Sequence, residues 1–522
     1  MNALPLLTLL TLVPLIGAVL VIGLSAQQQR LARWLSLGFS FAALALTLVL
    51  WRHFNAASGE IQFEEQHSWI PTLGAQYHLG VDGLGLLMVL LSAIVVPMAM
   101  LASWKIVERV PIYFALVLFL QAGLFGTFTA LNFFHWFIFW ELSLIPAFFL
   151  IKLWGGPLRT AAATQFFVYT MVGSIAMLLS FLAIFLATGK FDFIDLAEIG
   201  RNGTLASALS VKLGWGNLFQ TNGSLAIVIF AGVFLGLAVK VPVIPFHTWL
   251  PSAYAEASTG TTMLLTGVMS KMGVYGFVRI LLPIFPEQMR WAWAPTTLLW
   301  LAVITIIFSA SAAFAQRDLK RVLAYSSINH LGYCLLGVFA VADMSAATPS
   351  AVADKTAALN GVFLQMFNHG LTASTLFWFA GMLEERGGGL RGLDDFGGIR
   401  KVAPVFCGLM GIALFSSLGL PGLNGFIGEF LIFRGAFPLA TWATALSTIG
   451  LLVTAVFILG ILQRIFNGPL NEKWSKLPDL TWTERVLVLP AIGLMFALGI
   501  YPQLVLGFVN ETAKEMVKRM TF

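Results

Sequence analysis

The chain consists of long apolar segments separated by short polar ones. Fourteen of these segments are long enough for a helix to cross the ~30 Å hydrocarbon core of a bilayer, which takes about 18 to 25 residues. They lie at residues 4–24, 30–51, 80–103, 112–130, 132–153, 161–188, 223–250, 258–283, 291–314, 320–341, 357–383, 402–433, 440–466 and 485–509. The pattern predicts an all-α membrane protein with about fourteen transmembrane helices.

Composition supports this class and excludes others. Of the 522 residues, 58% are hydrophobic and only 10% are charged, which is too apolar for a water-soluble core. The formal net charge of +6 comes from basic residues scattered over short loops, so we predict no nucleic-acid interface. Cys334 and Cys407 lie far apart without a CxxC motif, which argues against a disulfide scaffold, structural zinc and an iron–sulfur cluster.

The distribution of lysine and arginine predicts the orientation. An even number of helices puts both termini on one side of the membrane. The loops that follow odd-numbered helices hold 17 of the 30 basic residues. Loops with an excess of lysine and arginine stay in the cytoplasm. Both termini are therefore predicted on the non-cytoplasmic side, with residues 4–24 as a retained first span rather than a signal peptide.

The loops are too short to form a catalytic domain. The longest lie at 52–79, 189–222, 342–356 and 384–401. The last is rich in glycine but lacks the Lys-Ser/Thr ending of a phosphate-binding loop, so we predict a flexible turn. The fragment GVDGLGLL is explained in the same way, as a helix N-terminus capped by Asp82.

Several polar residues are predicted to lie away from the membrane centre. His53, His67 and His78 fall in the first long loop and are expected to be solvated. His135 stands among tryptophans and is expected in an aromatic belt at the membrane interface. Glu256 falls near the cytoplasmic end of its segment, where we expect it to face a loop.

Two predicted helices are interrupted close to a buried charge. In the first, Lys240 is followed by Pro242 and Pro245, which break the helix near mid-membrane. In the second, Pro421 stands among glycines, and Glu429 follows about two turns later. The breaks are five helices apart, the spacing expected of an inverted repeat over helices 4–8 and 9–13. Prolines that only kink helices for packing are the alternative explanation.

Three ionisable side chains lie inside apolar segments, namely Glu141, Lys240 and Lys271. Such residues cost roughly 2.5 kcal/mol or more on insertion scales, so a functional site with an ionisable partner is the expected explanation. Burial disfavours the charged form, whereas an opposite charge within ~4–6 Å favours it. A Lys–Glu pair that opens and closes therefore changes the proton affinity of its lysine. Histidine is suited to relay protons onward, and water has to complete the connections.

Six motifs, in order along the chain, resemble those of a known family. They are FWELSLIPAFFLIKLWGG, KVPVIPFHTWLP, AYAEAS, AQRDLKRVLAYSSINHLGY, FNHGLTAS and LPGLNGFIGEF. Over residues 80–470 the chain is similar to the antiporter-like subunits of respiratory complex I, the proton-translocating NADH:quinone oxidoreductase. It is most similar to the M type, because the L and N types usually carry lysine near the place of Glu429.

The resemblance implies an architecture and a cellular setting. Two inverted five-helix repeats would occupy 112–283 and 284–466, with helices 1–3 at 1–111 and helix 14 and a tail at 467–522. The chain would lie in the bacterial inner (plasma) membrane beside L-type and N-type neighbours. No cofactor is expected in this chain; NADH, flavin, iron–sulfur clusters and quinone are expected in partner subunits.

The resemblance also implies a proton wire made of matching positions. Its members on helices 5, 7, 8, 10, 11 and 12, together with the histidine after the first break, are Glu141, Lys240, Lys271, His330, His369, Glu429 and His247. Structural roles are the alternatives: a salt bridge for the Lys–Glu pair, hydroxyl partners for the histidines, and a helix cap for His247.

Two further hypotheses remain for the whole chain. A subunit of a multisubunit sodium/proton (Mrp-type) antiporter would share this ancestry and much of the wire, although no acidic cluster suggests a dedicated sodium site. A static assembly scaffold would need none of the buried charges. Ser252, where the family commonly has aspartate, and the long 342–356 connection depart from the family pattern and leave the electron donor open.

Overall fold

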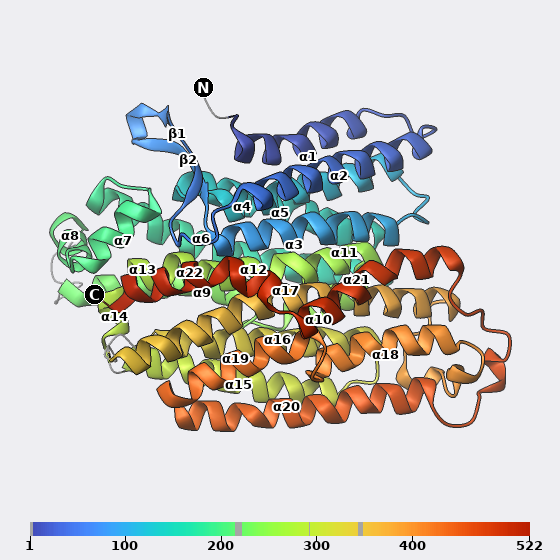
Figure 1. The fold of residues 1–522 in the computed structure, drawn as a ribbon. Coiled ribbons are helices and arrows are strands. Elements are labelled where there is room, and N and C mark those ends of the chain that lie inside the picture. Colours follow the sequence, from blue (N-terminus) through green and yellow to red (C-terminus); the bar gives the residue numbers. More distant parts are fainter. Residues whose placement is uncertain (1–3, 214–221, 292, 343–347, 522) are drawn as a thin grey trace.

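The computed structural model describes residues 4–213, 222–291, 293–342 and 348–521. Its helices run side by side along one common direction (Figure 1). Ten helices in these ranges are long and apolar enough to cross a membrane: α2 (Gln29–His53), α3 (Gly83–Ala102), α4 (Val110–Thr129), α5 (Phe133–Trp154), α6 (Arg159–Thr188), the rod Thr259–Ile284, α15 (Trp293–Ala315), α16 (Leu319–Val341), α20 with its π-helical end η7 (Thr441–Phe466) and α21 (Trp482–Ile500). Shorter apolar helices are α1 (Leu6–Ile22), α9 (Asn222–Lys240) and α18 (Pro404–Leu418). The prediction of an all-α membrane protein is confirmed.

The helices divide into an inner and an outer group. In the rod Thr259–Ile284 and in α16, 94% of the most apolar stretch is buried, whereas in α21 only 28% is. Outer helices such as α6 and α20 expose apolar side chains, including Leu179 and Leu452. Exposed apolar surface of this extent suits lipid or a neighbouring membrane protein. The inner helices hold the buried ionisable side chains.

Some helix boundaries differ from the sequence prediction. The segment predicted at 357–383 is the longer helix α17 (Pro349–Arg386), and that predicted at 485–509 is two helices, α21 and α22 (Gln503–Thr521). Pro502 lies between α21 and α22, where its missing N–H and its ring prevent one continuous helix. Residues 214–221 and 343–347 of the predicted loops lie outside the described residues.

The first predicted break lies where expected. Helix α9 ends at Lys240, and α10 (Trp249–Glu256) resumes after the prolines. The rod Thr259–Ile284 that follows contains two wide, π-helical turns, η3 (Leu265–Met269) and η4 (Phe277–Leu281). Its α-helical parts are α11 (Thr259–Leu264), α12 (Ser270–Gly276) and α13 (Leu282–Ile284). Lys271 lies between the π-helical segments, which are often found at functional sites.

The second break also lies where expected, between α18 and α19 (Asn424–Leu439). Gly419 ends α18 with φ 81° and Gly422 follows with φ 93°. Both values belong to the left-handed region that glycine tolerates best. Pro421 stands between them and cannot continue the helix.

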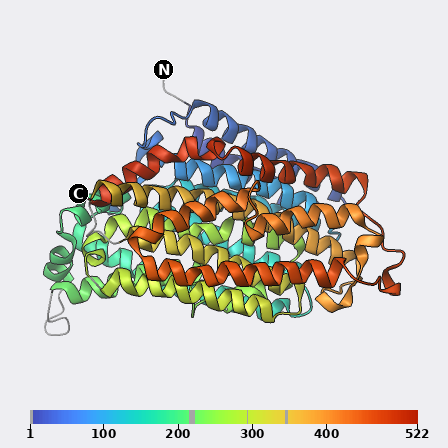
Figure 2. The same ribbon diagram turned by 60° about the horizontal axis from the view of Figure 1, so that its bottom comes forward.

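A β-hairpin and two short helices cover the end of the bundle at which both termini lie (Figures 1 and 2). Strands β1 (Gln62–Ile70) and β2 (Ala75–Val81) pair antiparallel, with Gln66 opposite His78. Helices α7 (Phe193–Arg201) and α8 (Leu205–Leu213) come from the second long loop, and α14 (Pro286–Met289) follows α13. The hairpin and these helices were not predicted from the sequence.

His78 is buried rather than solvated, which corrects the prediction for this residue. Its Nδ1 lies 2.5 Å from Asp192 Oδ2, and its Nε2 lies 2.8 Å from Glu64 Oε1. Burial opposes protonation, but hydrogen bonds and charges from Asp192 and Glu64 outweigh it and raise the pKa of His78. The imidazolium thereby joins the hairpin to the start of α7.

The contact at His78 should weaken in alkaline solution. Because its folded pKa is raised above the unfolded value near ~6.5, its stabilising contribution is complete below that value and is lost as pH rises through the folded pKa. Hydrogen exchange of residues 62–81 should therefore accelerate above neutral pH beyond its intrinsic chemical dependence. In His78→Gln this extra pH dependence should disappear, and its persistence would contradict the assignment.

The opposite end carries a network of ion pairs. Lys320 at the start of α16 lies 2.5 Å from Glu384 of α17. Arg391 lies 2.8 Å from Glu256 and 2.6 Å from Asp318. Glu256 also accepts a hydrogen bond from the backbone N–H of Leu158, so it faces loops at this end as expected. The glycine-rich connector at this end contains two 3₁₀ turns, η5 (Leu393–Asp395) and η6 (Ile399–Lys401), and η8 (Glu472–Trp474) follows in the next loop.

Candidate functional site

Lys271 and His369 form the first half of a buried polar row. Lys271 Nζ lies 2.8 Å from His369 Nδ1, and both side chains are buried. The ammonium also donates to the backbone carbonyl of Thr266 and, at 3.3 Å, to Ser270 Oγ. No ion pair to Lys271 exists within the described residues. A protonated Lys271 is thus stabilised by dipoles rather than by a carboxylate.

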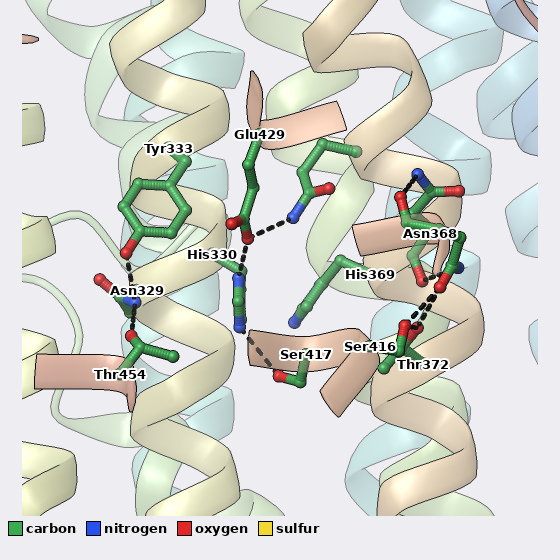
Figure 3. Close-up of polar contacts among 12 residues, drawn as sticks. Asn329, His330, Tyr333, Asn368, His369, Thr372, Ser416, Ser417, Glu429 and Thr454 are labelled. Atoms are coloured by element: carbon green, nitrogen blue, oxygen red, sulfur yellow. Dashed lines mark hydrogen bonds and ion pairs between the residues drawn. The ribbon is translucent and has the colours of Figure 1, made fainter. Parts of the chain in front are cut away.

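His330 and Glu429 form the second half of the row (Figure 3). His330 Nδ1 lies 2.8 Å from Glu429 Oε1, and His330 Nε2 lies 3.0 Å from Ser417 Oγ. Glu429 Oε1 also accepts a hydrogen bond of 3.1 Å from Gln365 Nε2. Glu429 is 5% exposed and lies beside the break between α18 and α19.

The two halves meet at the histidines. The rings of His330 and His369 lie 5.2 Å apart between centroids. A cavity of about 10 Å³ lies beside His369 and is also lined by Ser327 and Ser417. This is room for roughly one water molecule, and the lining supplies the polar partners that such a water needs. The order Lys271, His369, His330, Glu429 is therefore continuous apart from one short gap.

Glu141 and Lys240 form a looser pair than the sequence analysis predicted. No ion pair within 4.0 Å joins them among the described residues, and Lys240 Nζ has no hydrogen-bond partner. The ammonium instead lies 4.9 Å from the ring centroid of Trp140, a cation–π contact. Glu141 Oε1 is likewise buried without a partner. The structure therefore holds the pair in a separated arrangement.

His247 and His135 lie off this row. His247, between α9 and α10, packs against Phe308 with ring centroids 5.4 Å apart, and its Nδ1 is buried without a partner. His135 is 5% exposed and packs on Tyr77 and Phe139. Trp136 and Trp140 are also buried, so the expected interface belt at this place is wrong.

The second break is fixed by side-chain hydrogen bonds to α17 (Figure 3). Asn368 Nδ2 donates to the carbonyl of Asn424 at 2.6 Å, and Ser416 donates to Asn424 Oδ1. The hydroxyls of Thr372 and Ser416 lie 3.1 Å apart. Because Asn368 is adjacent to His369 in sequence, the same helix positions the break and the histidine.

Asn424→Ala should loosen this junction. It leaves the buried hydroxyls of Ser416 and Thr372 without their shared acceptor, at a cost of about 1–3 kcal/mol. The temperature at which the variant complex loses half of its activity in mild detergent should fall. Thr441→Ala, which removes only a local bond on an exposed helix end, is the control and should change it little. Equal half-inactivation temperatures for Asn424→Ala and Thr441→Ala would contradict the role of Asn424.

Residues 130–457 match the family described as "NADH:quinone oxidoreductase/Mrp antiporter, TM". The match covers more than half of the chain and includes every member of the predicted wire. The chain belongs to this family. Membership makes it a multi-pass membrane protein, in agreement with the helices described above.

Individual members of the family match over nearly their full length. The chain is 33% identical to "NADH-quinone oxidoreductase subunit M" of Mycobacterium tuberculosis, over 98% of this chain and 94% of the relative. It is 34% identical to "F(420)H(2) dehydrogenase subunit M" of Methanosarcina mazei, over 98% of each. Among solved structures, a chain of "Respiratory complex I from Thermus thermophilus with bound NADH" has a TM-score of 0.82 and 28% identity, over 98% of this chain and 99% of that chain.

Two elements of this family member's polar interior were not predicted. Gln365 lies three helix positions from Asn368 on α17 and contacts Glu429; a buried amide in an apolar segment was its only sequence signal. Asp82 caps α3 as predicted, accepting from Gly85 N at 3.0 Å, but it also forms a buried ion pair with Arg279 of η4. No group of three or more potential metal ligands occurs within the described part of the chain.

Proposed function

We propose that this chain is a proton-translocating subunit in the membrane arm of a redox-driven quinone oxidoreductase of the complex I type. Protons would move along Glu141, Lys240, Lys271, His369, His330 and Glu429, with His247 beside the first break. Electron transfer would take place in partner subunits that hold NADH or another donor, flavin, iron–sulfur clusters and quinone. L-type and N-type antiporter-like subunits would be its lateral neighbours.

The observation that carries the proposal is the contact between Lys271 and His369. An ammonium and an imidazole 2.8 Å apart can exchange a proton directly, because the imidazole accepts what the ammonium donates. His330 and Glu429 then continue the path with donors and acceptors in contact. A static salt bridge would instead pair each buried lysine with a carboxylate, as Lys320 pairs with Glu384.

The separated Glu141–Lys240 pair supports a switching role. When the carboxylate approaches, it favours the protonated lysine, and when it withdraws, burial favours proton release. Such a change would bias transfer toward Lys271 through intervening water. Each half of the wire would then respond to the charge state of the other.

Membrane placement is part of the proposal. The majority of basic loop residues lie at the end opposite the termini, which supports a cytoplasmic location for that end and a non-cytoplasmic one for both termini. A bacterial plasma membrane is the proposed location. The four parts 1–111, 112–283, 284–466 and 467–522, with two inverted repeats, complete the proposed organisation.

A sodium/proton antiporter subunit of the Mrp type is the second candidate, because the family description includes it. Relatives at 33% and 34% identity are both named as subunits of redox enzymes, which supports the first candidate. The chemistry of the wire is common to both candidate functions and does not distinguish between them.

Co-purification distinguishes directly between the redox-driven complex and the Mrp-type antiporter. An affinity-tagged chain should be extracted from its native membrane in mild detergent, and the bound proteins identified by mass spectrometry. We expect flavin- and iron–sulfur-binding subunits together with other antiporter-like subunits, and quinone reduction by the purified complex. A complex that holds only small membrane subunits and has no redox centre would contradict the proposal.

A further inference from the structure

A pocket outside the proton wire lies at the end of the bundle that carries both termini. It has a volume of about 90 Å³ and is bounded by α7, the end of the Lys271 rod, the stem of the hairpin and α22. Figure 1 shows these elements gathered at that end. Most of the lining is apolar and includes Leu131, Phe193, Ala197, Leu282 and Met516.

Three arginines from three different elements line the same pocket, namely Arg201, Arg279 and Arg519. The side chain of Arg201 makes no hydrogen bond or ion pair with any described residue. Arg279 pairs with Asp82 but keeps a buried Nε that has no hydrogen-bond partner. Arg519 is held at the rim by Glu60 and Glu515, at 2.9 and 2.8 Å. The pocket thus offers one unpaired guanidinium group, that of Arg201, beside an apolar wall.

The depth of the pocket corresponds to the boundary of the bilayer. Lys271 stands at the middle of the span Thr259–Ile284. Arg279 is eight residues further along, which is about 12 Å at the rise of an α-helix and close to half of a ~30 Å hydrocarbon core. Gly200 of α7 packs on the carbonyl of Ile284, which holds Arg201 beside the end of this span. Cationic side chains at this level are in reach of lipid headgroups.

We propose that this pocket binds an anionic phospholipid of the leaflet on the side of the termini. Arg201 receives the phosphate, since a guanidinium group binds phosphate through several directed hydrogen bonds. One acyl chain packs on Phe193, Ala197 and Leu282. A small soluble anion would leave that apolar wall unused, and a zwitterionic phospholipid would bring a cationic headgroup close to the arginines, which an anionic headgroup avoids.

The site has a structural consequence for the chain. The bound lipid joins α7, the end of the Lys271 rod and α22, which come from distant parts of the sequence. It therefore stabilises the termini-side end of the same rod that carries Lys271. This role is independent of the electron donor and of the ion that the complex moves.

Lipid retention by the intact complex tests the proposal. The complex is reconstituted in a bilayer of phosphatidylcholine and phosphatidylglycerol at four to one, extracted again in mild detergent, and its bound lipids are counted by mass spectrometry. Arg201→Gln removes the unpaired cation, and Ala197→Phe fills the acyl site. Each should lower retained phosphatidylglycerol about fivefold or more, a factor that corresponds to the loss of about 1 kcal/mol of binding.

Arg52→Gln is the matched control, because Arg52 is an exposed arginine at the end of α2 on the same side and lies outside the pocket. It should retain the parental amount of lipid. Equal retention by Arg201→Gln and the parent would overturn the proposal, even if Ala197→Phe failed to assemble. Displacement of the lipid by inorganic phosphate would also overturn it, because it would indicate an anion site without an acyl pocket.

Discussion

Lys271→Met is expected to lower proton pumping about tenfold or more while the complex still assembles. Methionine has a similar length and fills the same buried space, so packing of α12 against its neighbours should change little. It cannot carry a proton, however, and positioned proton-transfer groups commonly contribute factors of 10² or more. The row would lose the group that lies 2.8 Å from His369.

Pumping should be measured by quenching of a pH-sensitive dye in sealed vesicles, together with the rate of quinone reduction. Lys152→Met is the control, because Lys152 is an exposed lysine near the end of α5. It should pump at the parental rate. A Lys271→Met complex that assembles and pumps at the parental rate would exclude a role for Lys271 in proton transfer.

Glu429→Gln should give the second-largest loss, about fivefold in pumping. Glutamine keeps the shape of the side chain and can still bond to His330 and Gln365, but it does not take up a proton at physiological pH. Glu429→Asp keeps the carboxyl group and should restore part of the activity. The test is the same vesicle assay, carried out at several pH values.

Glu472→Gln serves as the control for this series, since Glu472 is exposed in the loop before α21. It should leave pumping unchanged. Equal pumping by Glu429→Gln and the parent would mean that protons leave the row before reaching α19. A loss that Glu429→Asp does not relieve at any pH would instead indicate a packing defect.

The helices were predictable because their signals are local. A long apolar run is read directly from consecutive residues, and the prolines near 242 and 421 mark the two breaks that the structure contains. The split at Pro502 was missed because the residues around it remain apolar enough to read as one span. The hairpin was missed because its first strand, β1, is mostly exposed and carries several charged and polar residues.

The site was only partly predictable, since its contacts join distant positions. Lys271 and Glu429 were selected as buried charged residues and His369 through the family resemblance, but the direct Lys271–His369 contact spans 98 residues of sequence. The pairing of His78 with Asp192 spans 114 residues, and no local pattern indicated that a loop histidine would be buried. Asn424 carried no signal because an asparagine after a proline–glycine turn usually serves the turn itself.

The wide turn before Lys271 affects how a positive charge on this lysine is compensated inside the membrane. Within η3, the carbonyl oxygen of Thr266 accepts a hydrogen bond from the ammonium group of Lys271. The peptide backbone thereby takes the place that a fixed anion would otherwise occupy. A dipole attracts the ammonium without binding it as strongly as a full negative charge, so release of a proton from Lys271 would not require an ion pair to separate first.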